Sequence, residues 1–164
     1  MERKWLAHFI DANFGKSEVT NYRLGKDIEE YNIELNGEIE EKTNILGENS
    51  VVHKGYKPTA SVDTFYAKNG DTLSDKLMEI VNERLKGDDV RTTVVDVIMD
   101  DSGKVVSAYR EEVVIDVKSI GGSTEVNIPF DIHYAGNRVK GTFDTTTKIF
   151  TVGTAAAAST TTEE

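Results

Sequence analysis

Apolar and polar residues alternate with a period of two through most of the second half of this chain. The strictest case is TEVNIPFDIHYA (124–135), whose apolar side chains stand at every second position: Val126, Ile128, Phe130, Ile132 and Tyr134. Successive side chains of a β-strand point to opposite faces, so such a segment buries one face and exposes the other. The pattern predicts a largely antiparallel sheet.

Further strands are predicted at 92–99 and 105–119, joined by the turn DDSGK (100–104), whose glycine suits a positive φ. GN (136–137) is predicted to turn the strand 124–135 into RVKGTFD (138–144), and TTT (145–147) to turn that strand into KIFTV (148–152). Pro129 has no backbone N–H to donate, which indicates a strand edge or a bulge. In 105–119 we expect one face to carry Val105, Ser107, Tyr109, Val113, Ile115 and Val117.

One amphipathic helix is predicted at about 71–86. Thr72 is the expected N-cap, with Asp75 three residues later, and Gly87 is the expected end. A single apolar stripe at helical spacing would face the sheet: Leu73, Leu77, Ile80, Val81 and Leu85. The sequence therefore predicts a mainly β fold, an antiparallel β-sandwich or open barrel with one flanking helix.

The chain of 164 residues has the length of one domain, which we place at 1–154. The segment AAAASTTTEE (155–164) has no periodicity and is predicted to be a disordered, flexible C-terminal tail. We expect no signal peptide and no membrane span, because the apolar stretch after the basic N-terminus is short and interrupted by His8 and Asp11. We therefore expect the protein to be made in the cytoplasm.

Composition argues against several classes of function. The chain has no cysteine, so neither disulfides nor thiolate chemistry can operate. Its net charge of −10 disfavours wrapping nucleic acid, because phosphate binding needs clustered Lys and Arg.

No motif indicates catalysis or metal binding. NFGKS (13–17) lacks the first glycine of a phosphate-binding loop, because that position is Ile10, so Lys16 is expected in a surface turn. The histidines, His8, His53 and His133, lie in separate segments and are predicted to be surface or interface residues. We expect no catalytic, cofactor or metal site, and no enzymatic activity.

The segment YNIELNGEIEEKTN (31–44) predicts a strand over 32–43 with one acidic face. Ile33, Leu35 and Ile39 alternate with a polar set: Glu34, Asn36, Glu38 and Glu40. Residues 27–48 hold eight acidic residues against one basic residue, Lys42, so a net −7 of the chain's −10 lies there. An ordinary solvated face remains the alternative interpretation.

The following segment, 43–58, combines scattered Gly, Asn and Pro with apolar residues at Ile45, Leu46, Val51 and Val52. It is either a long loop or a ragged hairpin, and we favour a loop with strand-like arms. Its apolar residues would either meet a partner or close one end of the monomer's core.

The order of these elements resembles the tail tube (major tail) protein family of long-tailed bacteriophages. The resemblance is carried by RLGKDIEEYNIELNGEIEEKTNILGENSVVHKGYKPTASVDTFYAKNGDTLSDKL (23–77), AYREEVVIDVKSIGG (108–122) and IPFDIHYAGNRVKGTFD (128–144). It spans about Trp5 to Val152. It implies a virion protein that forms rings, typically hexameric, stacked into a hollow tail tube that conducts DNA into the host.

The resemblance also implies roles for particular residues. Glu34, Asn36, Glu38 and Glu40 are candidates to line the lumen, where an acidic wall would repel DNA and let it slide without specific binding. The inter-ring loop candidates are Ile45, Leu46, Gly47, Glu48, Asn49, Val51, Val52, Lys54 and Tyr56. Expected partners are further copies of the chain, the tape measure, the tail terminator and the baseplate or tip.

A monomeric β-sandwich binding module is the alternative from another class. Only Trp5 and a few tyrosines could form a stacking platform for such a module. A hydrolase with an acidic site is less favoured, because adjacent carboxylates on a strand point to opposite faces.

Overall fold

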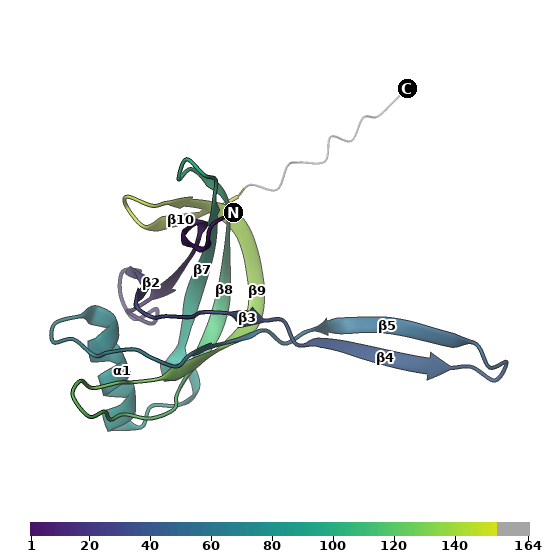
Figure 1. Cartoon of the computed structure of the whole chain (residues 1–164), viewed down its shortest axis with the longest axis horizontal. Helices are drawn as coiled ribbons and strands as arrows, with labels where there is room; N and C mark the ends of the chain where they lie inside the picture. The colour runs from purple at the N-terminus through teal and green to yellow at the C-terminus, as the bar shows by residue number, and fades with distance from the viewer. Residues whose placement is uncertain (154–164) are drawn as a thin grey trace.

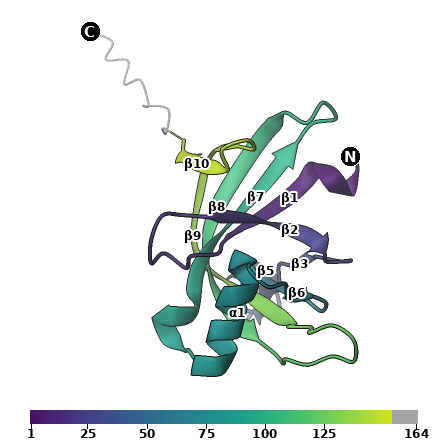
Figure 2. The ribbon, with the colours of Figure 1, turned by 90° about the vertical axis from the view of Figure 1, so that its left-hand side faces the viewer.

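The computed structural model describes residues 1–153, so the predicted tail at 155–164 lies outside the described residues. Its main feature is a curled antiparallel sheet with strand order β2-β1-β7-β8-β9-β6-β3, to which β10 adds on β9 (Figures 1 and 2). The strands are β1 (Leu6–Asp11), β2 (Asn21–Asp27), β3 (Ile33–Glu34), β6 (Thr59–Val62), β7 (Arg91–Met99), β8 (Val105–Val117), β9 (Phe130–Asp144) and β10 (Ile149–Val152).

The remaining elements are one α-helix, two short 3₁₀ turns and a separate hairpin. They are α1 (Thr72–Glu83), η1 (Arg3–Trp5), η2 (Gly87–Val90), and the strands β4 (Gly37–Thr43) and β5 (Asn49–Tyr56). The predicted class, mainly β and antiparallel with one flanking helix, is confirmed. Within residues 1–153, no helix is long and apolar enough to cross a membrane.

β9 runs straight through the predicted turn at 136–137, so that prediction was wrong. Gly136 (φ 99°) and Asn137 (φ 57°) do adopt positive φ, but inside one strand of 15 residues. The β8–β9 register shifts on both sides of Glu112, which pairs with Gly136. These residues therefore form an irregularity that bends the strand pair without reversing the chain.

The start of the predicted strand 124–135 is also corrected, because β9 begins only at Phe130. The preceding residues form a loop that is tied to the segment after β6. Ala67 N–H donates to the Val126 carbonyl (2.8 Å) and Ile128 N–H to the Phe65 carbonyl (2.9 Å). Pro129 thus lies just outside the strand, where its missing N–H does not remove a hydrogen bond between neighbouring strands.

Buried side chains cover both faces of the sheet. α1 places Leu73, Leu77 and Ile80 in a first cluster with sheet residues that include Val94, Val113, Ile115, Phe130 and Ile132. Neighbouring positions on β7 alternate, and Val95 and Val97 enter a second cluster on the opposite face, with Ala7, Phe9, Met99, Ala108 and Phe143. Val105 packs on the second cluster, so the single face predicted for 105–119 is wrong.

The helix is confirmed but shorter than predicted. Its N-cap is Asp71, not Thr72, and the Asp71 carboxylate accepts from the Ser74 N–H (3.1 Å). It ends at Arg84, which adopts the left-handed conformation (φ 52°), before the predicted Gly87, which instead begins η2. An arginine occupies the position where glycine is usual.

Replacing Leu77 with alanine should destabilise the fold by ~2–5 kcal/mol, because a fully buried side chain between α1 and the sheet would leave a cavity. Urea denaturation followed by circular dichroism measures the change. Asn82→Ala, on the exposed side of the same helix, is the control and should change stability by less than ~0.5 kcal/mol. Equal effects of the two variants would show that α1 does not close the core.

Candidate assembly surfaces

The hairpin β4–β5 projects away from the body as a separate two-stranded ribbon, hereafter the arm (residues 37–56; Figure 1). It grows out of the β3–β6 pair, in which Ile33 pairs with Ala60 and Glu34 with Thr59. The segment 43–58, predicted as a loop with strand-like arms, is therefore the tip and second strand of an ordered hairpin. All nine inter-ring candidates lie on it.

The turn at the tip is held by Asn44. Its side-chain oxygen accepts from the backbone N–H groups of Leu46 (2.9 Å) and Glu48 (3.0 Å), and its amide nitrogen donates to the Glu48 carboxylate (2.7 Å). In an Asx turn of this kind, the asparagine side chain forms hydrogen bonds with backbone N–H groups that would lack a partner in an irregular loop. The apolar tip residues Ile45 and Leu46 are thereby presented in a fixed conformation.

The root of the arm depends on Asn36, which adopts positive φ (47°). Its amide donates to the Lys57 carbonyl (3.1 Å) and to Thr59 Oγ1 (3.1 Å). The strand predicted over 32–43 is therefore interrupted here and becomes β3 and β4. Leu35 and Ile39, expected on a half-buried face, are both exposed.

One face of the arm is ion-paired. Glu38 binds Lys57, and the Glu40 carboxylate lies 2.7 Å from Lys54 Nζ and 3.5 Å from Lys42 Nζ. Such exposed pairs contribute ~0.2–1 kcal/mol each. Glu38 and Glu40 do share a face, but lysines from β4, from β5 and from the segment after β5 neutralise it. Whether Glu34, Asn36, Glu38 and Glu40 face a lumen stays a prediction.

The other face of the arm exposes apolar side chains to solvent, with Glu41 opposite Val51 among them. Ile39 and Val51 lie on it with His53, which contacts the ring of Tyr56 (centroids 4.5 Å apart). At the tip, Leu46 is 77% exposed and Ile45 is 102% exposed. None of these residues belongs to either buried cluster of the chain, so they do not close the monomer's core.

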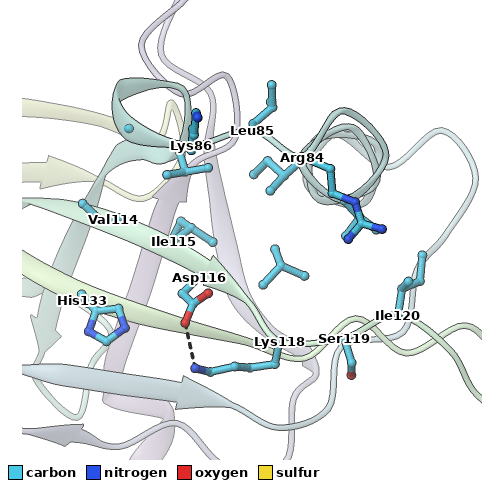
Figure 3. Close-up of a pocket in the computed structure, with 15 residues that line it drawn as sticks. Arg84, Leu85, Lys86, Val114, Ile115, Asp116, Lys118, Ser119, Ile120 and His133 are labelled. Atoms are coloured by element: carbon cyan, nitrogen blue, oxygen red, sulfur yellow. Dashed lines mark hydrogen bonds and ion pairs between the residues drawn. The ribbon is translucent and has the colours of Figure 1, made fainter.

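A groove with a volume of about 730 Å³ lies between the end of α1 and the end of β8, hereafter the α1 groove (Figure 3). Its apolar lining includes Val81, Leu85, Val117 and Ile120. Arg84 and Lys86 lie on its helix side and Lys118 on its sheet side. Lys118 is bound to Asp116 (2.7 Å) and Asp131 (3.0 Å).

A cluster beside this groove, Asp116, Asp131 and His133, has ligand atoms within 4.8 Å of one another. The Lys118 ammonium already bridges its two carboxylates. Burial disfavours the charged form of Asp131, yet hydrogen bonds from Lys118 and Ser61 outweigh it and hold the pKa of that carboxyl below its ordinary value. The cluster is best explained as an ion-paired group. His133 is exposed on the outer face of β9, as predicted.

His8, predicted at a surface, is buried in a polar network that joins four strands. Its Nδ1 lies 2.7 Å from Asp96 Oδ1, and Arg138 donates to both Asp96 (3.2 Å) and Glu111 (2.9 Å). Both carboxylates are nearly inaccessible, with side chains 7% and 8% exposed. Each has a partner inside the network, which therefore serves to hold β1, β7, β8 and β9 together.

A tyrosine pair continues this network. Tyr31 Oη and Tyr134 Oη are 3.0 Å apart, and the Tyr31 ring lies against His8 with centroids 4.4 Å apart. Burial raises the pKa of both phenols well above their ordinary value, so both stay neutral. Sequence reasoning missed this network because residues that bond directly in it are up to 103 positions apart in the chain.

Replacing Arg138 with leucine should destabilise the protein by ~1–3 kcal/mol at neutral pH, because Asp96 and Glu111 would keep buried charges and lose their shared cation. The half-exposed position of Arg138 lets water replace part of the loss. Lys140→Leu removes the same charge two residues along β9 and is the control. Urea denaturation of both variants measures the free energy of unfolding. An Arg138→Leu variant as stable as the wild type would contradict the proposed role of the network.

Comparisons with known proteins address the fold. No family model and no curated protein sequence matches the chain. Among solved structures, the SPP1 phage tail tube is similar with a TM-score of 0.60 and 15% identity, over 89% of this chain and 82% of that one. The sheath/tube terminator of the extracellular contractile injection system PVC is similar with a TM-score of 0.54 and 7% identity, over 87% and 96% of the two chains. The chain therefore has the fold of tail tube and tube-terminator subunits.

Proposed function

We propose that this protein is a structural subunit of a phage-type tail tube that assembles into stacked rings, hexameric by the family resemblance. The observation that carries the proposal is the arm, which is ordered, exposes apolar side chains on one face and at its tip, and belongs to no core of its own chain. The likeness in fold to the SPP1 tail tube supports the same role.

The arm suits a permanent contact between copies. Exposed apolar patches on a single subunit mark surfaces that a partner covers. An obligate interface buries ~2,000 Å² or more, which a ribbon of two strands can approach if both its apolar face and its tip are covered. In this proposal the arm links one ring to the next, as the sequence resemblance implies.

The same proposal places the protein in the virion. Its partners would be further copies of the chain, then the tape measure, terminator and baseplate or tip proteins, with genomic DNA passing through the lumen without specific binding. A monomeric binding module is the alternative, and it differs in one measurable property: it stays monomeric at any concentration.

Negative-stain electron microscopy tests the proposal directly. The wild-type protein should form rings or hollow tubes as concentration rises, and uniform monomers under all conditions would favour the binding module. Replacing residues 39–54 with Asn-Gly shortens the arm to a tight hairpin and removes its apolar tip. This variant should remain folded, because the arm supports no core, and should form no long tubes.

Reversing Glu38 and Glu40 to lysine separates the two roles proposed for the arm. If these side chains line the lumen, tubes should form normally and DNA ejection from assembled virions should slow or stop, because the wall would attract phosphate. If they serve the contact between rings, the tubes themselves should shorten, because Lys42, Lys54 and Lys57 would lose their partners. Normal tubes with normal ejection would exclude both roles.

A further inference from the structure

The structure also indicates where the arm docks. We propose that the tip of the arm of one copy inserts into the α1 groove of a second copy, with Ile45 and Leu46 against the apolar lining and Glu41 and Glu48 beside Arg84 and Lys86. This inference rests on the proposed function, since it names the surface that receives the arm.

The occupant must come from another copy. α1 and the arm lie at opposite ends of the long axis of the molecule (Figure 1). The arm is anchored at its root by Asn36 and by the hydrogen bond from Lys57 N–H to the Leu35 carbonyl (3.1 Å), which hold it pointing away from its own body. A contact between two different surfaces is heterologous, and repeated copies of it generate rings or helical stacks.

The tip and the groove both offer apolar side chains to a partner. The two most exposed aliphatic side chains of the arm stand next to each other at its end, on a turn that Asn44 fixes. The α1 groove has a volume of about 730 Å³, and its lining includes Ile80, Val81, Leu85, Val117 and Ile120. Ile120 is itself 42% exposed, so the groove offers apolar surface to an incoming side chain.

The charges left over on the two surfaces are opposite. Within the described residues, Glu41 and Glu48 form no ion pair, whereas Glu38 and Glu40 are already paired along the arm. On the groove, Lys118 is held by Asp116 and Asp131, but Arg84 and Lys86 form no ion pair within residues 1–153. These two carboxylates lie near the apolar tip, where that of Glu48 accepts a hydrogen bond from the Asn44 amide (2.7 Å), and the two cations lie at the groove.

A second basic surface makes the choice specific. The groove between η1 and β2 is lined by Arg3, Lys4, Arg23 and Lys26 and has a smaller volume, about 440 Å³. It offers positive charge to the arm as well, but the structure places Arg3 on the Tyr31 carbonyl and Lys4 on Glu2. Arg23 and Lys26 form no ion pair within residues 1–153, so charge alone does not separate the two grooves. The α1 groove has the larger volume, about 730 Å³ against about 440 Å³, so it is the better match to the tip.

Cross-linking tests this contact, because the chain has no cysteine of its own. One chain carries Ser50→Cys near the tip, and a second, differently tagged chain carries Ser119→Cys, an exposed residue of the α1 groove whose replacement keeps Arg84 and Lys86. The control for the second chain is Glu29→Cys, an exposed residue of the other basic groove whose replacement keeps the cations there. After treatment with a short bismaleimide, the Ser50→Cys chain should form at least tenfold more heterodimer with Ser119→Cys than with Glu29→Cys.

Replacing Ile45 and Leu46 by serine in the Ser50→Cys chain should reduce this yield to the control level without affecting folding, since both side chains are exposed. Equal yields at the two grooves, or a preference for Glu29→Cys, would overturn the docking site. Electron microscopy of the wild type separates the two levels of the argument. Preferred cross-linking without tubes would support the docking contact and contradict the proposed tail tube function. Tubes without preferred cross-linking would support the tail tube function and contradict the docking contact.

Discussion

The pairing of β8 with β9 is the contact on which the rest of the structure depends. It runs from Ala108 opposite Gly141 to Val117 opposite Phe130, and its bend at Glu112 lets one strand pair serve both buried clusters. The outer edge of β9 carries β6 near its start and β10 near its end. Because the arm leaves from the β3–β6 pair, the position of β9 fixes where the arm begins.

The parts of the fold that sequence could predict are those governed by local periodicity. The predicted strands 92–99 and 105–119 correspond to β7 and β8, strict alternation predicted the start of β9, and the apolar stripe predicted α1. The turn assigned to 136–137 failed because glycine and asparagine mark positive φ, which a bulge requires as much as a reversal does. Likewise, His8 looks like a surface residue until Asp96, 88 residues later, is brought beside it by strand pairing.

The acidic segment shows the same limit for electrostatics. Along β4 alone, glutamates dominate one face, and the sequence therefore predicts a negative electrostatic potential on that face. However, two strands contribute side chains to this face. Lys54 on β5 forms an ion pair with Glu40, and Lys57, just after β5, forms one with Glu38. What remains unpaired lies nearer the tip, at Glu41 and Glu48. The carboxylates without an ion pair are therefore concentrated toward the tip of the arm and are not spread evenly along it.

An ordered arm has a consequence for association that a loop would not have. Ordering a flexible segment on binding costs conformational entropy and weakens the complex. Here the Asn44 turn and the cross-strand hydrogen bonds order the tip when the subunit folds. Binding between copies therefore does not lose this conformational entropy a second time. A two-stranded ribbon is nonetheless marginal in water by itself. Covering its apolar face with a second copy would stabilise the ribbon and the assembly through the same contact.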